Sequence, residues 1–497
     1  MANSVSMILA PLTDSEQCHS LGSDKPEEAC GVFGIYAPEE DVGTMTYFGL
    51  YALQHRGQES AGIATFSGSQ VHLHKDMGLV SQVFNESTLE KLTGEWAIGH
   101  TRYSTTGSSH KANSQPAVIE SRLGKLALAH NGNLVNTLEL RQILERRGCD
   151  FETTTDSEMI AVAIAQEVDQ GNDWLDAIVN ALQLCSGAYS LAIATPKGLM
   201  GARDPQGIRP LVIGTLTEKG NPVRYVLASE TCALDIIGAD FLRDVEPGEI
   251  VQITEEGLSS FHWKTESHRK LCIFEMIYFA RPDSIMHEES LYSYRMRLGQ
   301  QLARESIVKA DLVIGVPDSG IPAAIGFSQV SGITYGEGLI KNRYVGRTFI
   351  QPTQHMRESG IRMKLNPLKD VLQGQRVIIV DDSIVRGTTS RKLVKTLREA
   401  GASEVHMRIS SPPVTHPCFY GIDTDNQSQL IAATKSIQAI AHQIGVDSLA
   451  YLSWEGMLTA TGEDTNSFCS ACFTGDYPIA IPDKLKGSKL MLETSNA

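Results

Sequence analysis

The stretch from Gln375 to Thr389 contains the residue types of a site for phosphate and a metal ion. An apolar run, Val377 to Val380, leads directly into two carboxylates, Asp381 and Asp382. The loop that follows is made of small and hydroxyl residues, including Ser383, Gly387, Thr388 and Thr389. Backbone N–H groups and hydroxyls of such a loop can converge on a phosphate at a helix N-terminus. Two carboxylates would repel that phosphate unless they bind sugar hydroxyls or a cation, so the set suits a ribose 5-phosphate with Mg²⁺ nearby.

The pattern around this stretch is typical of a parallel sheet. Val and Ile on both faces of the 377–380 strand predict burial on both sides, and a helical pattern follows from Arg391 to Ala400. Leu312 to Val316 predicts a second buried strand, which ends in the loop Pro317 to Pro322. Ligands bind at the carboxyl ends of such strands. Taken alone, the second loop also fits an ordinary turn.

The 375–389 stretch resembles the phosphoribosyl-diphosphate (PRPP) motif of type I phosphoribosyltransferases. It differs from a Walker loop, because no Gly-x4-Gly-Lys pattern is present. The resemblance implies that Ser319, Asp381 and Asp382 contact Mg²⁺. It also implies a larger set of PRPP-binding residues: Ser319, Lys341, Arg343, Arg347, Asp381, Asp382, Ser383, Arg386, Gly387, Thr388 and Thr389.

Residues 341–364 form a basic cluster, with six Lys or Arg and one acid. A solvated run of charge would explain it. It also resembles the catalytic loop of the PRPP amidotransferases, which closes over the substrate. In that interpretation Lys341, Arg343 and Arg347 neutralise diphosphate, while closure keeps water from C1 and ammonia from escaping.

Cys30 begins the first strand-like segment, after a polar leader without periodicity. If cleavage made it the first residue, its α-amine, with a pKa of about 7.7–8.0, could take the proton of its own thiol, whose pKa is about 8.5. Polar motifs follow between strand-like segments at 54–62, 99–107, 130–133 and 155–158.

With Cys30, these motifs resemble in order the class II, N-terminal-nucleophile (Ntn) glutamine amidotransferase domain. That resemblance implies that Cys30 attacks the amide of glutamine, and that Asn131 and the Gly132 N–H form the oxyanion hole. Arg102 would bind the α-carboxylate as a bidentate fork, and Asp156 the α-ammonium. We expect the mature protein to start at Cys30.

Four late cysteines, Cys272, Cys418, Cys469 and Cys472, include one Cys-x2-Cys pair. Their spacing is compatible with structural zinc, with a 4Fe–4S cluster or with no metal. One branch of the glutamine–PRPP amidotransferases has both a cleaved leader and a 4Fe–4S cluster. Resemblance to that branch implies a structural cluster at these four residues.

Composition sets outer limits on the class of protein. The 497 residues are 42% hydrophobic and 20% charged, which is typical of a globular chain with two or more domains. The formal net charge of −15 argues against non-specific nucleic-acid binding. No apolar run approaches the roughly 20 residues of a membrane span, and no secretory signal is present. We therefore expect a cytoplasmic protein with reduced thiols.

The resemblance to the glutamine–PRPP amidotransferases extends from residue 30 to about 475. It predicts a propeptide (1–29), an α+β Ntn αββα sandwich (30–262), and an α/β type I phosphoribosyltransferase domain with a mainly parallel sheet (263–497). It implies that glutamine and PRPP give 5-phosphoribosylamine, glutamate and diphosphate, that purine nucleotides inhibit, and that the chain assembles as a tetramer or dimer.

Two alternatives stay open. Class II domains also precede sugar-isomerase domains in glucosamine-6-phosphate synthesis, but that partner does not need the 375–389 motif. A PRPP-binding regulator without chemistry would not need Cys30.

Overall fold

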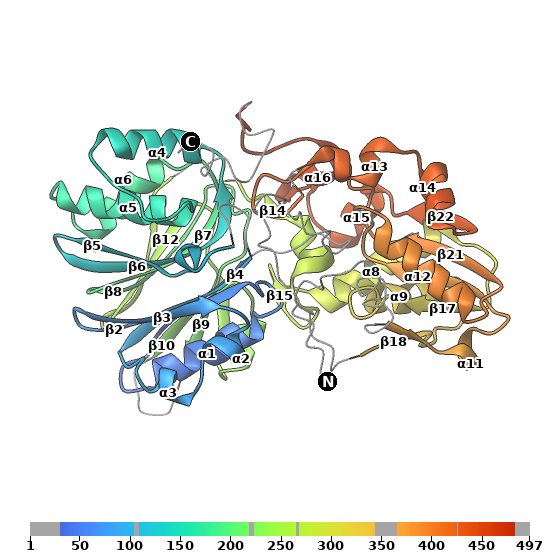
Figure 1. The fold of residues 1–497 in the computed structure, drawn as a ribbon, viewed down its shortest axis with the longest axis horizontal. Helices are drawn as coiled ribbons and strands as arrows, with labels where there is room; N and C mark the ends of the chain where they lie inside the picture. The colour runs from blue at the N-terminus through green and yellow to red at the C-terminus, as the bar shows by residue number, and fades with distance from the viewer. Residues whose placement is uncertain are drawn as a thin grey trace, which may run out of the picture.

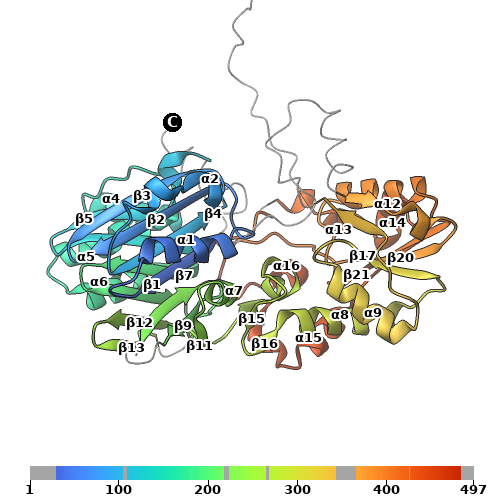
Figure 2. The ribbon, with the colours of Figure 1, turned by 90° about the horizontal axis from the view of Figure 1, so that it is seen from below.

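The computed structural model describes residues 30–103, 109–217, 223–264, 268–342, 365–424 and 426–482. The chain forms two halves that lie side by side, the N-terminal half at the left of Figure 1 and the C-terminal half at the right. The view from below in Figure 2 shows the same separation. The predicted leader (1–29), Arg343 and Arg347 lie outside the described residues.

The N-terminal half contains two antiparallel sheets. The first has the order β11 (Asp240–Asp244), β9 (Val212–Leu216), β10 (Arg224–Ala228), β1 (Gly31–Tyr36), β4 (Trp96–Arg102), β2 (Ser60–Ser67), β3 (Gln70–Met77). The second has the order β13 (Gly257–His262), β12 (Glu249–Thr254), β8 (Gly198–Arg203), β7 (Gly187–Thr195), β6 (Gly124–Leu134), β5 (Ala117–Ser121).

These sheets stack face to face with helices outside. Val32, Ile98 and Ala129 belong to a core between the two sheets, where alternate side chains of each strand point inward. Helix α1 (Val42–Ala52) packs on the outer face of the first sheet. Helices α4 (Thr137–Arg146), α5 (Asp156–Asp169) and α6 (Trp174–Gln183) cover the second sheet. The predicted αββα sandwich is confirmed.

The C-terminal half is built on a four-stranded parallel sheet. Its order is β17 (Leu312–Gly315), β20 (Arg376–Asp381), β21 (Glu404–Ile409), β22 (Ser448–Tyr451). Ile378 and Val380 of β20 belong to one core, with α8 (Leu291–Ser306) and α9 (Ile321–Ser331). Val377 and Ile379 belong to the opposite core, with α12 (Thr388–Glu399) and α14 (Ile437–Ile444). Burial on both faces, as the apolar run predicted, follows from helices on both sides.

Shorter elements connect these layers. They are α2 (Val80–Val83), α3 (Glu86–Leu89), α7 (Cys232–Asp235), β14 (Leu271–Cys272), a π-helix (Glu275–Phe279), β15 (Ile285–Met286), β16 (Glu289–Ser290), β18 (Leu339–Lys341), β19 (Leu365–Pro367), α11 (Lys369–Leu372), α13 (Ile431–Thr434), α15 (Trp454–Thr461), β23 (Phe468–Cys469), α16 (Ala471–Thr474), and the 3-10 turns Lys111–Asn113, Gln427–Gln429 and Thr465–Ser467.

Two local expectations differ from the structure. His130 to Asn133, expected between strands, lies inside β6, because its backbone pairs with β7 as far as Leu134. Helix α12 begins at Thr388, not Arg391, since Gly387 with φ of 80° ends the loop. Strand β13 ends at His262, where the predicted first domain ends. The domain limits themselves stay a prediction.

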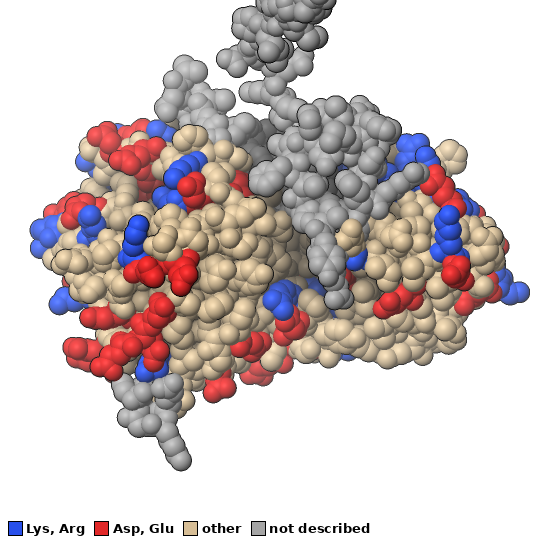
Figure 3. Space-filling view, turned by 60° about the horizontal axis from the view of Figure 1, so that its bottom comes forward, with Lys and Arg blue, Asp and Glu red and all other residues tan. Residues whose placement is uncertain are grey.

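Charge is unevenly distributed on the face shown in Figure 3. Acidic side chains gather over the N-terminal half at the left, and Lys and Arg are scattered among them. Among the described residues, no helix combines the length and the apolar character needed to cross a bilayer.

Candidate active sites

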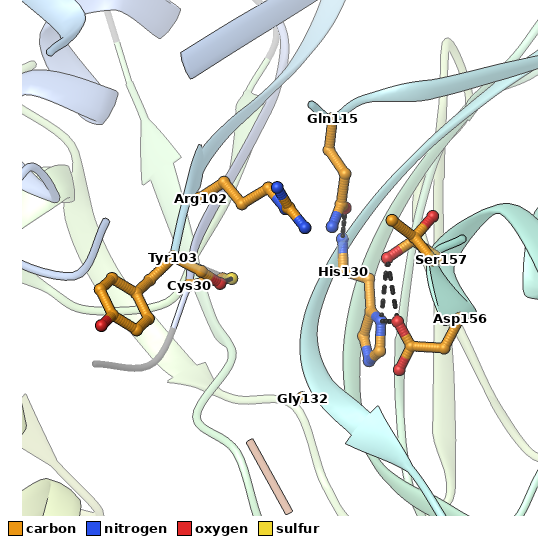
Figure 4. Close-up of a pocket in the computed structure, with 9 residues that line it drawn as sticks. Cys30, Arg102, Tyr103, Gln115, His130, Gly132, Asp156 and Ser157 are labelled. Atoms are coloured by element: carbon orange, nitrogen blue, oxygen red, sulfur yellow. Dashed lines mark hydrogen bonds and ion pairs between the residues drawn. The ribbon is translucent and has the colours of Figure 1, made fainter. Parts of the chain in front are cut away.

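A pocket in the N-terminal half opens between the two sheets. Its lining residues are Cys30, Arg102, Tyr103, Gln115, His130, Gly132, Thr155, Asp156 and Ser157. Figure 4 shows Cys30, Tyr103 and Arg102 on one side and His130, Asp156 and Ser157 on the other. Strands β1 and β4 are neighbours, with Gly31 opposite Thr101, so Cys30 and Arg102 meet at one sheet end. Four of the predicted glutamine-site residues therefore share one cavity: Cys30, Arg102, Gly132 and Asp156.

Cys30 is almost fully enclosed, with 5% of its surface exposed. Its thiol donates to the carbonyl oxygen of Tyr103 at 3.4 Å. Burial raises the pKa of the Cys30 thiol to about 11, against smaller lowerings by the hydrogen bond to Tyr103 and by Arg102. The thiol is therefore neutral at pH 7 in this form of the chain, and it needs a base before it can act as a nucleophile.

Arg102 and Asp156 supply opposite charges at the pocket. Arg102 ends β4 and pairs with Glu59 at 2.7 Å. Asp156 is the first residue of α5, whose N-cap Thr155 accepts from the N–H of Glu158. Burial works to raise the pKa of Asp156, but His130 and the N–H groups of Leu134 and Ser157 outweigh it, so the pKa lies below its ordinary value. Asp156 is therefore an anion at neutral pH.

Asn131 and Gly132 lie near the C-terminal end of β6. Gly132 has a φ of 147°, and an added Cβ would come within 2.0 Å of the Ala188 carbonyl oxygen, so only glycine fits. The Asn131 side chain is fully buried, and its Nδ2 and Oδ1 have no hydrogen-bond partner within the described parts of the chain. Gly132 lines the pocket; Asn131 is not among the lining residues. A buried amide left unsatisfied is costly unless a ligand completes it.

A buried network of charged side chains contacts the backbone of Cys30. Arg56 donates from Nε to the Cys30 carbonyl oxygen at 3.0 Å. Its terminal nitrogens pair with Glu230 at 2.6 Å and with Glu275 at 2.8 Å. Glu275 also pairs with Arg209 at 2.9 Å, and all four side chains are fully buried. Because Arg56 lies between α1 and β2 and Glu275 lies in the π-helix that precedes α8, this network joins the two halves of the molecule.

A loop of the C-terminal half reaches the pocket strand. Asn133 donates to the carbonyl oxygen of Phe419 at 3.0 Å, and Tyr103 donates to Asp423 at 3.4 Å. Gly421 lies so close to Gly132 that an added Cβ would sit 3.1 Å from the Gly132 carbonyl. Strand β6 is thus in direct contact with the other half.

A second group of predicted residues lies at the end of β20. Asp381 and Asp382 are buried, and Ser383 donates to Asp382 at 2.6 Å. Thr388 and Thr389 are the first two residues of α12, directly after Gly387. Arg386 is half-buried and donates to Gln429 at 3.1 Å. The two carboxylates and the N-terminus of α12 are therefore adjacent, which suits an anion and a cation bound together.

The loop after β17 lies against the same edge. The Val316 N–H donates to the Val380 carbonyl oxygen at 2.9 Å, and a Cβ on Gly320 would come within 2.4 Å of that oxygen. Ser319, half-buried, is therefore held beside the end of β20. Lys341, at the end of β18, forms an ion pair with Asp318 of this loop. The structure thus places Ser319 and Lys341 next to the carboxylate site.

The four late cysteines come together between the halves. Cys272 and Cys469 are opposite each other in the parallel pair β14–β23. Cys418 and Cys472 pack against the same core. Burial raises the pKa of Cys272 to about 11, and burial with the other three sulfurs raises that of Cys472. Within the described ranges, no three His, Cys, Asp or Glu are arranged around a single metal ion. Cys272 and Cys469 are buried, whereas Cys418 and Cys472 are partly exposed.

The sequence placed His130 in a motif but did not predict its contact with Asp156. It also did not predict the contacts of Arg56, Glu275 and Arg209. The pairs Arg56–Glu275 and Arg209–Glu275 join residues 219 and 66 positions apart, which no local pattern can indicate.

Comparison with known proteins assigns a domain family to each half of the chain. Residues 100–235 match a glutamine amidotransferase domain, and residues 289–410 match a phosphoribosyl transferase domain. The Amidophosphoribosyltransferase of Synechocystis sp. is 72% identical over 98% of this chain and 99% of its own length. The chain belongs to the amidophosphoribosyltransferase family. It is therefore a glutamine-hydrolysing pentosyltransferase, and it performs the glutamine- and PRPP-dependent first step of purine biosynthesis.

Other relatives extend this family assignment. The Bacillus subtilis Amidophosphoribosyltransferase is 51% identical over 91% of this chain and 95% of its own length. The solved glutamine PRPP amidotransferase of B. subtilis, complexed with ADP and GMP, superposes with a TM-score of 0.85 at 50% identity, covering 91% of this chain and 98% of that one. A structure described as the allosteric regulatory enzyme of purine biosynthesis gives 0.86 at 49% identity, covering 92% and 97%.

Proposed function

We propose that glutamine is hydrolysed at Cys30 and that the ammonia reacts with PRPP where β17 and β20 end. The observation that carries this proposal is the shared pocket of Cys30, Arg102 and Asp156. A cation and an anion across one cavity match the α-carboxylate and α-ammonium of an amino acid. The Cys30 sulfur attacks the amide carbon, ammonia leaves, and water cleaves the thioester to glutamate. Asn131 and the Gly132 N–H bind the developing oxyanion.

Removal of residues 1–29 would supply the missing base. With its nitrogen in a peptide bond, Cys30 has only a buried thiol, whose pKa is raised to about 11. A free α-amine has a pKa of about 7.7–8.0 and lies on the same residue, so it can accept the thiol proton near neutral pH. The Arg56 side chain then holds the terminal residue through its carbonyl oxygen.

In the C-terminal half, PRPP binds with its phosphate at the start of α12 and its diphosphate at the loop of Ser319. The C1–O bond to diphosphate breaks and a C1–N bond to ammonia forms, with loss of a proton. Asp381, Asp382 and Ser319 would hold Mg²⁺, which neutralises the leaving diphosphate. Lys341, Arg343 and Arg347 would neutralise the diphosphate, and ammonia would pass between the halves without entering solvent.

The remaining parts of the proposal concern cofactor, assembly and control. Cys272, Cys418, Cys469 and Cys472 would hold a 4Fe–4S cluster with a structural role, because neither half-reaction transfers electrons. The ADP and GMP in the B. subtilis relative favour regulation by purine nucleotides. Family members are usually tetramers or dimers, so we propose a homo-oligomer. A pathway that operates in the cytosol favours a cytoplasmic location.

The test separates the two sites with two variants and two nitrogen donors. Cys30→Ala should lose glutamine-dependent synthesis and keep synthesis from ammonium chloride. Asp382→Asn should lose synthesis from both donors and keep basal glutamine hydrolysis. If Cys30→Ala still hydrolysed glutamine, the nucleophile would be elsewhere. If Asp382→Asn retained full ammonia-dependent synthesis, the assignment of the PRPP site would fail.

A further inference from the structure

His130 lies directly beside the carboxylate of Asp156. Its ring is buried, and Figure 4 shows it between the strand and the start of α5, with dashed lines to Asp156 and Ser157. His130 Nδ1 lies 3.2 Å from the Ser157 hydroxyl oxygen and 3.6 Å from Asp156 Oδ1. This nitrogen therefore faces both the Ser157 hydroxyl and the Asp156 carboxylate.

The position of the His130 residue is fixed from the other directions. Its N–H donates to Gln115 Oε1 at 2.8 Å, and its carbonyl oxygen lies 2.9 Å from His100 Nε2. His130 Nε2 lies 3.5 Å from the Ala188 carbonyl oxygen in the neighbouring strand β7. Because the backbone and the second ring nitrogen both have partners, the ring has little freedom to turn away from Asp156.

The same strand holds the second oxygen of the carboxylate. Asp156 Oδ2 accepts from the Leu134 N–H at 3.0 Å. His130 and Leu134, both in β6, therefore contact one oxygen of Asp156 each, and the Ser157 hydroxyl also lies 3.5 Å from Oδ1. The orientation of this carboxylate in the pocket depends on the strand that also contains Gly132.

We propose that His130 is a positioning residue that orients Asp156 toward the α-ammonium of glutamine and so sets selection for an α-amino acid. This rests on the proposed role of Asp156 in binding glutamine. In this proposal His130 does not act on the amide carbon or on the leaving ammonia. It acts through Asp156, so its loss should affect substrates that carry an α-ammonium more than those that lack one.

The test compares glutamine with 4-carbamoylbutanoate, the same amide and carboxylate without the α-amine. His130→Gln places its amide near the position of Nε2 and leaves Ser157 as the remaining donor near Asp156 Oδ1. We expect its kcat/KM for glutamine to fall about tenfold, mainly through KM, and that for 4-carbamoylbutanoate to change less than about twofold. His130→Asn places its amide near Nδ1, so we expect it to lose less than about threefold with glutamine.

Two controls isolate the effect. His74→Gln removes a histidine whose Nε2 contacts the Val83 carbonyl at 3.0 Å, outside the pocket, and should leave both substrates unchanged. Ammonia-dependent synthesis should stay at the wild-type level in every His130 variant, which shows that the chain is folded.

A double-variant cycle then decides the mechanism. If His130 acts through Asp156, adding His130→Gln to Asp156→Asn should cost nothing further with glutamine. The proposal would be overturned if the two substitutions had multiplicative effects on kcat/KM for glutamine. It would also be overturned if His130→Gln lowered kcat/KM equally for both substrates. If Asp156→Asn alone left the KM for glutamine unchanged, the proposed glutamine site would fail instead.

Discussion

Glu275 is the acceptor that balances two buried arginines, and its replacement should destabilise the whole chain. Its Oε1 accepts from Arg56 at 2.8 Å and from Arg209 at 2.9 Å, and its Oε2 accepts from Arg56 at 3.0 Å. In Glu275→Gln the amide oxygen can keep the first two contacts, while the amide nitrogen faces the Arg56 donor. Glu230 then remains as the anion paired with Arg56.

The size of the loss in stability follows from the buried arginine charge that no longer has its carboxylate partner. Removing one partner of a buried ion pair costs about 3–5 kcal/mol. We expect about 3 kcal/mol for Glu275→Gln, which keeps two contacts, and about 5 kcal/mol for Glu275→Ala, which keeps none. For a domain of this size the smaller loss corresponds to a fall in the first unfolding midpoint on the order of 10 °C.

Calorimetry of the full chain should measure this fall, with Asp76→Asn as the matched control. Asp76 pairs with Lys111 at 2.8 Å, but the two side chains are 45% and 59% exposed. A surface pair contributes less than about 1 kcal/mol, so the control midpoint should move by less than about 3 °C. If Glu275→Gln moved the midpoint no more than Asp76→Asn, the buried network would not be a source of stability, and our reasoning about it would be wrong.

Two further predictions concern the glutamine pocket. With residues 1–29 attached, Cys30 should react slowly with iodoacetamide at pH 7.5. The rate should rise about tenfold per pH unit toward pH 11, because only the thiolate reacts. Rapid alkylation at neutral pH would contradict a buried neutral thiol. Gly421→Ala should lower glutamine-dependent synthesis at least about fivefold, because the new methyl group presses on Gly132 and the residue has a φ of 106°. Gly445 has a φ of 86° and open space around it, so Gly445→Ala measures backbone strain alone and should retain activity. Equal losses of glutamine-dependent synthesis in the two alanine variants would exclude contact with Gly132 as the cause.

The carboxylate site could be predicted from sequence because its determinants are local. The strand, the pair Asp381 and Asp382, the loop and the start of α12 follow one another within 15 residues. The sheet order then brings the loop of Ser319 alongside, since parallel neighbours end at one edge. The fold class was predictable for the same reason. The spacing of apolar residues indicates whether a segment is a helix or a strand, and polar loops mark where it ends.

The rest depended on contacts between distant parts of the chain. His130 to Asn133 looked like a connection, because polar residues and an Asn-Gly pair are typical of turns. The pairing of β6 with β7 overrides that preference and buries His130 beside Asp156. Likewise, Glu275 is one acid among many in the sequence, and only the packing of the two halves places it between Arg56 and Arg209. The convergence of four cysteines was implied by family resemblance rather than by spacing.

The central claim is that one chain hydrolyses glutamine in one half and uses the ammonia in the other. The most direct test is glutamate release by anaerobically purified protein that begins at Cys30, measured with and without PRPP and Mg²⁺. The account predicts a strong rise on adding PRPP and Mg²⁺, with one diphosphate released per glutamate. Hydrolysis at the same rate without PRPP, or glutamate released with no matching diphosphate, would contradict it.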